Sequence, residues 1–338
     1  MTTSDTDHNL NLRAAATAIA ARVETAMRGD LERSLADCDP LLIEVVRYAL
    51  FNGGKRIRPL LTVLCSRCCG RDDDDLYLLA AAFEYLHVAT LVHDDVIDRA
   101  SQRRGKETVV ARYGLAAAIL AGDWLHARSM HLIGSLAGPE GLEIFCRATA
   151  SMVNGEFEQL RHSNDLTTQE HHYFRIIRQK TGNLIASTCA IGALFAGADR
   201  RRQQALARYG DNIGTAFQVV DDLLDYQGDT QTTGKITGND FVEGKITLPL
   251  FHALARASNE DRQRIETLFQ GDRTQPEAYQ RLVDSIAQYD GFATATHTAK
   301  QLIAAAIDAL ALFARPDGED PNIGLLKGLA EYILARNR

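Results

Sequence analysis

Apolar residues recur every three to four positions from Leu10 to the end of the chain, which is the period of an amphipathic helix. Turn-forming residues such as Asn52-Gly53-Gly54, Gly138-Pro139 and Gly271-Asp272 separate these segments. No alternating strand pattern of useful length is present, so the sequence predicts an all-α fold. The expected helices cover residues 10–28, 41–50, 56–69, 74–98, 108–135, 140–161, 168–178, 182–196, 201–226, 246–256, 259–270, 276–288, 291–314 and 322–336.

Some of these helices are apolar on more than one face, as in the segment from Phe83 to Val96. A helix of that kind belongs in the middle of a bundle. With no long linker and no tandem repeat, we expect one large helical bundle, a single domain over residues 1–338 in which residues 1–9 are flexible.

Composition narrows the class of protein. Of 338 residues 46% are hydrophobic, which is ample for a large core, and 37 basic against 44 acidic residues give a net charge of −7. That balance argues against a nucleic-acid partner. No apolar run reaches the roughly 18 residues of a membrane span. The polar N-terminus lacks the features of a secretory signal, so a cytoplasmic protein is expected.

The six cysteines do not form a recognisable metal motif. Cys65 and Cys68 make a CxxC pattern, but no second pair or histidine cluster completes a zinc site. Because residues 60–69 are predicted to be a buried helix, we interpret these thiols as core residues in a reducing compartment, with a redox or metal role as the alternative. The run Asp72–Asp75 is interpreted as a helix cap and solvated face.

Two copies of one acidic motif stand out. Asp94-Asp95-Val96-Ile97-Asp98 and Asp221-Asp222-Leu223-Leu224-Asp225 are both DDxxD, and both follow apolar stretches. On a helix the first and last carboxylates lie one turn apart on one face, where like charges cost roughly 0.2–0.5 kcal/mol per pair. Carboxylates without Cys or His suit a hard cation such as Mg²⁺, which often takes phosphate oxygens as further ligands.

Basic loops accompany both acidic motifs. Lys55, Arg56 and Arg58 follow a Gly pair, and Arg103-Arg104-Gly105 follows the first motif. Lys235 and Lys245 follow the second. Arginine and lysine are natural ligands of phosphate oxygens, so the two signs together predict a metal-bridged diphosphate.

Each feature alone has a simpler explanation. One DDxxD is often a solvated helix face, Lys55 and Arg58 alone would be surface charge, and His87 alone would be a hydrogen-bonded core histidine. Their occurrence together favours a ligand site.

This combination resembles the trans-type isoprenyl diphosphate synthases, or polyprenyl synthetases, from about Leu41 to Arg336. The resemblance rests on ordered motifs: GGKRIRP at 53–59, LVHDDVID at 91–98, RRG at 103–105, GEFEQL at 155–160, KTGNLIAS at 180–187, FQVVDDLLD at 217–225 and GKITGNDFVEGKITLPL at 234–250. It implies an all-α bundle of the isoprenoid synthase type around a deep central cavity, with the two acidic motifs facing each other across its mouth. A homodimer is also implied.

The resemblance also implies a role for each motif residue. Three Mg²⁺ ions would be held with the allylic diphosphate, mainly by Asp94, Asp98 and Asp221, and directly or through water by Asp95, Asp222 and Asp225. The allylic diphosphate would be bound by Arg103, Lys180, Lys235 and Lys245. Isopentenyl diphosphate would be bound by Lys55, Arg58, His87 and Arg104. Lys180, Thr181, Gln218 and Lys235 would form the catalytic set, with Thr181 and Gln218 stabilising the developing cation.

The implied reaction is ionisation of the allylic C–O bond, attack by the double bond of isopentenyl diphosphate, and loss of a proton to the departing diphosphate. Positive charge stabilises that leaving group, and an apolar cavity keeps water from the cation. One departure from the family pattern is Glu107, which stands where a proline often follows the RRG motif. Its absence is expected to loosen the loop without removing either arginine.

Product length should depend on residues that precede Asp94 on the same helix. In the family a bulky aromatic four or five positions before that Asp gives short products, but here those positions are Ala89 and Thr90. At about 1.5 Å of rise per residue, Phe83 lies roughly 16 Å from Asp94, near the same face, and Leu86 is intermediate. We therefore expect a product of C30 or longer, used as a quinone side chain.

Three alternatives remain open from the sequence. The first is a shorter-chain (C15 or C20) farnesyl or geranylgeranyl diphosphate synthase. The second is a class I terpene synthase, which would not need the Lys55, Arg58 and His87 set because it holds no second diphosphate. The third is a non-catalytic partner subunit, although both acidic motifs are intact here.

Overall fold

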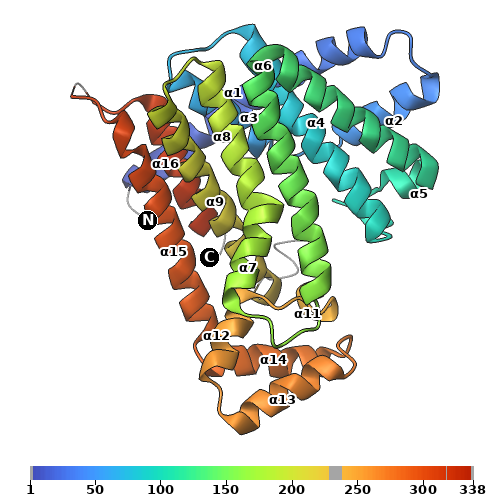
Figure 1. Cartoon of the computed structure of the whole chain (residues 1–338), viewed down its shortest axis with the longest axis vertical. Coiled ribbons are helices and arrows are strands. Elements are labelled where there is room, and N and C mark those ends of the chain that lie inside the picture. The colour runs from blue at the N-terminus through green and yellow to red at the C-terminus, as the bar shows by residue number, and fades with distance from the viewer. Residues whose placement is uncertain (1–2, 228–237, 317, 336–338) are drawn as a thin grey trace. The chain divides into compact units, whose positions relative to one another are not determined.

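The computed structural model describes residues 3–227, 238–316 and 318–335, and these residues are almost entirely helical (Figure 1). The helices are α1 (Thr3–Ser34), α2 (Pro40–Leu50), α3 (Ile57–Arg67), α4 (Asp74–Ile97), α5 (Val109–Tyr113), α6 (Leu115–His162), α7 (Glu170–Ile177), α8 (Asn183–Phe195), α9 (Arg200–Gln227), α11 (Asn239–Val242), α12 (Leu248–Arg256), α13 (Asn259–Gln270), α14 (Pro276–Gln288), α15 (Gly291–Ala309) and α16 (Pro321–Ala335). A π-helical turn, η1 (Arg178–Gly182), joins α7 to α8, and a 3₁₀ turn, η2 (Leu310–Phe313), follows α15. The predicted all-α class is confirmed.

The chain forms two compact units. Unit 1 comprises Met1–Cys146, Ser187–Leu206 and Phe313–Gly328, and unit 2 comprises Arg147–Ala186, Ala207–Leu312 and Leu329–Arg338. Helices α6, α8, α9 and α16 therefore contribute residues to both units. Each unit is described by itself below.

Unit 1 is organised around α4, which packs against α1 and α3. Side chains are buried on all sides of α4, as expected from its apolar sequence, and they include Phe83, Tyr85 and Leu86. The buried carboxylate of Glu84 forms an ion pair with Arg56, whose Nη2 also donates to the Leu50 carbonyl at 2.8 Å. A charged residue is tolerated in this core because its partner is buried with it.

By length and composition, α4 is the one helix in the described chain that could cross a membrane. However, 72% of its most apolar 18-residue window is buried inside the protein. That degree of burial is typical of a core helix, so the apolar character of α4 is accounted for by packing.

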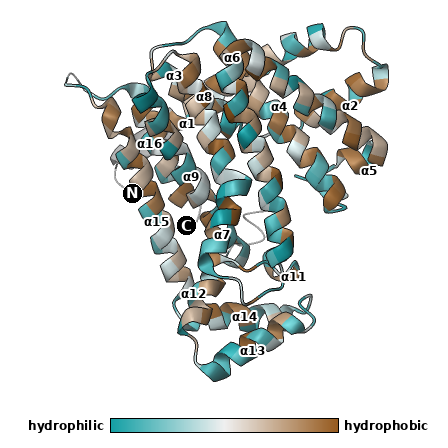
Figure 2. Ribbon diagram, viewed as in Figure 1, coloured by the Kyte–Doolittle hydropathy of each residue, from teal (hydrophilic) through white to brown (hydrophobic). Residues whose placement is uncertain are grey.

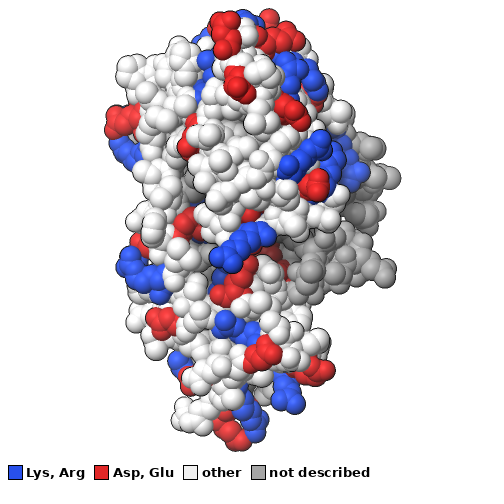
Figure 3. Space-filling model, turned by 90° about the vertical axis from the view of Figure 1, so that its right-hand side faces the viewer, with Lys and Arg blue, Asp and Glu red and all other residues white. Residues whose placement is uncertain are grey.

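In unit 2, α12 packs against α14 and α15, and α13 lies beside α14 near the amino end of α15 (Figure 1). Figure 2 shows mostly hydrophilic residues along α13, whose buried side chains are Ile265 and Phe269. On the face drawn in Figure 3, acidic and basic side chains are interspersed.

Most predicted boundaries lie within a few residues of the observed ones, and those of α13 and α14 coincide with the prediction. Helix α1 begins at Thr3 rather than at residue 10. The predicted break before residue 140 is present within α6 at Gly138, where φ is 69°. Periodicity did not reveal a two-stranded hairpin, β1 (Gln102–Arg103) and β2 (Lys106–Glu107), because each strand has only two residues.

Asp73 is the N-cap of α4, as the sequence predicted for its acidic run. One carboxylate oxygen accepts the Leu76 N–H at 3.1 Å, and the other pairs with Arg71 Nε at 2.7 Å. Asp75 lies in the first turn and is exposed. Thus Asp73 accepts a hydrogen bond from a backbone N–H of the first turn, whereas Asp75 is an exposed residue of the same turn.

We expect Asp73→Ala to lower the free energy of unfolding by about 1 kcal/mol, because a first-turn N–H loses its acceptor. Asp75→Ala is the matched control, and as an exposed substitution it should change stability by no more than about 0.5 kcal/mol. Urea unfolding followed by circular dichroism measures both. Equal losses in the two variants would contradict the capping role of Asp73.

Candidate active site

The first acidic motif lies at the carboxyl end of α4, in unit 1. Asp95 is buried, and its Oδ1 accepts a hydrogen bond from Arg103 Nε at 2.7 Å. Asp94 is half-buried, and Asp98, the C-cap of the helix, is exposed. The middle carboxylate is therefore fixed by protein contacts, whereas the outer two lie one turn apart and reach solvent.

The arginine loop after this motif is the β1–β2 hairpin. Arg104 and Gly105 form its two-residue turn, and both have positive φ, 53° and 74°. Such turns match the twist of a hairpin and favour glycine at the second position. Arg104 Nη1 donates to the Gly53 carbonyl at 3.0 Å, which ties the hairpin to the loop after α2.

Glu107, the departure from the family pattern, lies in β2 and is held in place. Its carbonyl accepts a hydrogen bond from the Tyr48 hydroxyl at 2.8 Å. The next residue, Thr108, donates to the Ala100 carbonyl at 2.7 Å and caps α5. These contacts restrain the loop that the missing proline was expected to loosen.

Arginine side chains, among them Arg58 and Arg104, lie near His87 on α4. Burial lowers the pKa of His87 well below its usual value, and the nearby Arg58 and Arg104 lower it further. Burial also lowers the pKa of Arg58, opposed by the Glu84 carboxylate. The Nε of Arg58 is buried without a hydrogen-bond partner among the described residues. Since the Glu84 carboxylate forms its ion pair with Arg56, the positive charge of Arg58 and Arg104 can bind an anion.

The second acidic motif lies near the carboxyl end of α9, in unit 2, and its second aspartate is buried, as in the first motif. Asp222 is buried, accepts the Tyr173 hydroxyl at 2.6 Å on Oδ2, and accepts Gln218 Nε2 at 2.9 Å on Oδ1. Asp221 and Asp225 are half-buried. Asp225 Oδ2 also accepts the Asp240 N–H at 3.0 Å, so hydrogen bonds fix both Asp222 and Asp225.

Negative charge is concentrated at this helix end. Burial, followed by the carboxylate of Asp240, raises the pKa of Asp222 to about 8 and that of Asp225 to about 6. A cation bound there would relieve this repulsion, so the donor set fits a hard metal ion. Within the residues described, no three His, Cys, Asp or Glu side chains converge as a complete metal cage. Mg²⁺ held by one or two carboxylates and a phosphate needs no such cage.

Lys180 and Thr181 belong to the π-helical turn η1, and π-bulges are frequent at functional sites. Lys180 Nζ lies 2.9 Å from Gln159 Oε1 and 2.8 Å from Glu156 Oε2. Thr181 Oγ1 donates to Gln218 Oε1 at 3.2 Å. Because Gln218 also donates to Asp222, hydrogen bonds link Thr181, Gln218 and Asp222.

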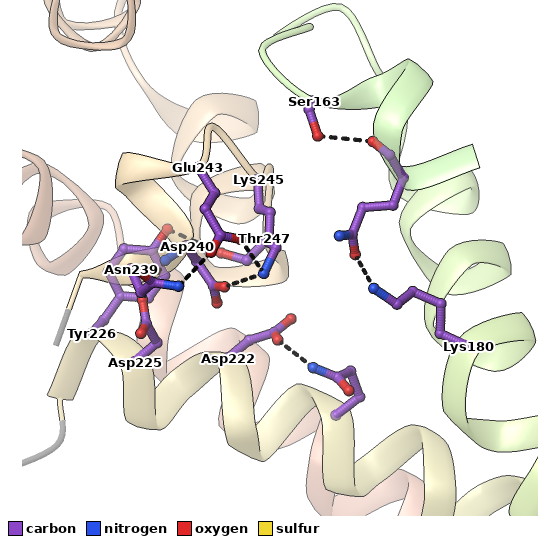
Figure 4. Close-up of polar contacts among 12 residues, drawn as sticks. Ser163, Lys180, Asp222, Asp225, Tyr226, Asn239, Asp240, Glu243, Lys245 and Thr247 are labelled. Atoms are coloured by element: carbon purple, nitrogen blue, oxygen red, sulfur yellow. Dashed lines mark hydrogen bonds and ion pairs between the residues drawn. The ribbon is translucent and has the colours of Figure 1, made fainter. Parts of the chain in front are cut away.

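Lys245, which follows α11, faces the pocket that Lys180 also lines (Figure 4). Its Nζ lies 3.1 Å from Asp240 Oδ1 and 2.6 Å from Glu243 Oε2. Burial lowers the pKa of Lys245, but these two carboxylates outweigh it and the net shift is upward. Lys180, Gln218, Asp222 and Lys245 line one pocket.

Several pocket residues were not among the predicted site residues. Gln159 and Asp240 occur inside motifs that carried the family resemblance, so their positions were a usable signal. Tyr173, whose hydroxyl fixes Asp222, had no such signal.

The remaining predicted residues are placed as follows. Lys55 is exposed in the loop before α3. Phe83, Leu86 and Ala89 are buried in α4, and the half-buried Thr90 donates to the His87 carbonyl at 2.8 Å. Lys235 lies outside the described residues.

Comparison with known proteins identifies the family of the chain. The polyprenyl synthetase family matches residues 39–286. Octaprenyl diphosphate synthase of Haemophilus influenzae is 36% identical over 85% of this chain and 87% of its own length. A decaprenyl diphosphate synthase structure from Rhodobacter capsulatus has a TM-score of 0.88 at 35% identity, covering 97% of this chain and 99% of that one. A polyprenyl synthase structure from Caulobacter crescentus CB15, complexed with calcium and isoprenyl diphosphate, has a TM-score of 0.85 at 36% identity, covering 97% and 98%.

The chain belongs to the polyprenyl synthetase family. The predicted enzyme class, a prenyltransferase that makes polyprenyl diphosphates, and the isoprenoid synthase type of fold are thereby confirmed.

Gly155 allows α6 to approach the π-helical turn closely. A Cβ at this position would lie 2.9 Å from Lys180 Cγ and 3.0 Å from the Lys180 backbone N. A methyl group here would therefore displace the backbone that carries Lys180 and Thr181.

We expect Gly155→Ala to lower kcat/KM for prenyl transfer by about 100-fold, since small misplacements of catalytic groups have effects of that order. Gly134→Ala, on the same helix, is the control, because its Cβ would make an ordinary contact of 3.4 Å with Leu142. Steady-state assays on both variants, with circular dichroism to verify folding, measure the effect. Unchanged activity in Gly155→Ala would contradict this role of the close approach.

Proposed function

We propose that this protein condenses isopentenyl diphosphate with an allylic diphosphate primer and yields an all-trans polyprenyl diphosphate of C30 or longer, for quinone side chains. The observation that carries this proposal is the cluster of Arg58, His87 and Arg104 beside the first acidic motif, in which the buried Nε of Arg58 has no hydrogen-bond partner among the described residues. A chain elongase needs a second diphosphate site of this kind, whereas a terpene synthase holds one diphosphate.

The acidic motifs fit Mg²⁺, and we propose that three ions bind with the allylic diphosphate. Asp94, Asp98 and Asp221 are the principal ligands because they reach solvent more than their buried neighbours. When bound, Mg²⁺ would neutralise the diphosphate and stabilise it as a leaving group. Asp95 and Asp222 orient the motifs through Arg103 and through Tyr173 and Gln218.

The protein's own residues have distinct tasks in the reaction. Arg103, Lys180, Lys235 and Lys245 hold the allylic diphosphate, and Lys55, Arg58, His87 and Arg104 hold isopentenyl diphosphate. The Thr181 hydroxyl and the Gln218 amide place oxygen atoms near the developing allylic cation and stabilise it. Their mutual hydrogen bond at 3.2 Å fixes their orientation before substrate binds. The departing diphosphate accepts the proton lost from the new chain.

Long products are favoured by the small side chains of Ala89 and Thr90 on α4. Relatives named as octaprenyl and decaprenyl diphosphate synthases support this choice. The same relatives make the shorter-chain alternative less favoured.

We also propose a cytoplasmic homodimer. Val153, Phe157 and Leu160 on α6 are 50%, 65% and 68% exposed and lie three to four residues apart, so they form an apolar stripe on one side of the helix. A stripe of this kind is suited to burial against a second copy.

The direct test is an assay with isopentenyl diphosphate, Mg²⁺ and a C10, C15 or C20 primer, with products sized by mass spectrometry. We expect a ladder that ends at C30 or longer. Ala89→Phe should shorten that limit, because a ring would close the cavity early.

A wild-type product that stops at C15 or C20 would contradict the proposed length but keep the chemistry. An unchanged product from Ala89→Phe would show that this wall of α4 does not limit the chain. The absence of any condensation with all three primers would overturn the proposed function.

A further inference from the structure

A second cavity lies in unit 2, outside the candidate active site. One wall consists of residues between 171 and 183, from α7 through η1 to the start of α8, and the other of residues between 298 and 305 on α15. Helix α12 packs against both α7 and α15. The cavity, here called the α7–α15 groove, has a volume of about 720 Å³, a size at which protein pockets take small molecules.

The charged side chains that line the α7–α15 groove are cationic. Arg175 on α7 and Arg178 in η1 are 46% and 50% exposed, and His171 is a further potential donor. Of the described residues that line the groove, none is acidic. Because the whole chain carries a net charge of −7, this local excess of positive charge is unlike the average of the protein and is suited to an anion.

The ion pairs of the two arginines leave them able to bind a ligand. Arg175 Nε lies 2.7 Å from Glu158 Oε2, and Arg178 Nε lies 3.8 Å from Asp211 Oδ2, beyond hydrogen-bond length. Burial raises the pKa of Asp211 and Arg178 only partly opposes this, so the second pair is weak. A guanidinium has five N–H donors, and a contact through Nε leaves its terminal nitrogens able to bind phosphate oxygens.

Apolar side chains lie on both walls of the same groove. Phe174 precedes Arg175 on α7, and Leu302 and Ala305 are one turn apart on one face of α15. Phe174 and Leu302 are half-buried, so part of each remains open to a ligand. A simple inorganic anion would use the arginines alone, whereas an anion with an apolar group would use both kinds of surface.

The α7–α15 groove and the active-site pocket share a wall. Arg178 and Gln179 line the groove, and Ile177 and Lys180, on either side of them in the chain, line the pocket that contains Asp222. A ligand held by Arg178 would therefore contact the π-helical turn that carries Lys180 without entering the active-site pocket.

We propose that the α7–α15 groove binds a soluble amphiphilic phosphate, that is, a phosphate ester of an apolar alcohol. Arg175 and Arg178 hold the phosphate group, and the apolar chain lies against Phe174 and Leu302. The site needs no metal ion, because the guanidinium groups supply the positive charge. The proposal concerns binding alone and does not depend on the proposed prenyl transfer function.

Calorimetric titration of the full-length protein with n-octyl phosphate tests the site, in EDTA so that metal-dependent binding elsewhere does not contribute. We expect Arg175→Gln and Arg178→Gln each to weaken binding by about tenfold, because each removes a charge-assisted hydrogen bond. Arg281→Gln is the matched control, since Arg281 is exposed on α14 and does not line the groove. Its affinity should stay within about twofold of wild type, and circular dichroism verifies that all three variants fold.

Two further measurements test the apolar part and the location of the site. Inorganic phosphate should bind at least about tenfold more weakly than n-octyl phosphate, because it buries no methylene groups. Leu302→Ala should weaken n-octyl phosphate and leave inorganic phosphate unchanged. In the wild-type protein, hydrogen exchange followed by mass spectrometry should show that n-octyl phosphate protects residues 171–183 and 298–305.

An affinity that neither arginine substitution changes would overturn the proposal. So would protection confined to other segments, or inorganic phosphate that binds as tightly as n-octyl phosphate. Binding to phosphatidylglycerol vesicles without binding of the soluble probe would make the groove a membrane contact and would also contradict it. Because none of these readouts measures prenyl transfer, their failure is distinguishable from failure of the proposed function.

Discussion

The concentration of like charge near the carboxyl ends of α4 and α9 is the constraint on which the rest of the structure depends. Burial and the carboxylate of Asp240 raise the pKa of Asp222 near the end of α9, and burial and the surrounding arginines lower the pKa of His87 on α4. Each arrangement is costly without a ligand of opposite sign. In the proposed function, a bound metal and diphosphate would stabilise charges of both signs, so the unfavourable electrostatics of the free protein would favour binding of the substrates.

The surrounding structure holds these charges in place. In both motifs the second aspartate is buried and hydrogen-bonded, Asp95 to Arg103 and Asp222 to Tyr173 and Gln218. The π-helical turn that carries Lys180 and Thr181 depends on the missing side chain of Gly155. Rigid support of this kind lets electrostatic stabilisation act without reorganisation during the reaction.

The sequence predicted the helices and the principal charged residues because both have strong local signals. Helical periodicity and turn residues located α13 and α14 to the residue, and motif order identified the family. The hairpin that carries Arg103 and Arg104 was missed because two-residue strands have no periodic pattern. The roles of Tyr173 and of Glu84 with Arg56 depend on contacts between residues far apart in the chain, which one sequence does not reveal.

The central claim is that both acidic motifs act together, through Mg²⁺, on one allylic diphosphate. Calorimetric titration of an unreactive allylic thiolodiphosphate, with and without Mg²⁺, tests it most directly when wild type is compared with Asp94→Asn and Asp221→Asn. The account predicts tight binding to wild type only with Mg²⁺, and a loss of at least about tenfold in affinity in each variant. Binding that is independent of Mg²⁺, or that one of the two substitutions leaves unchanged, would contradict it.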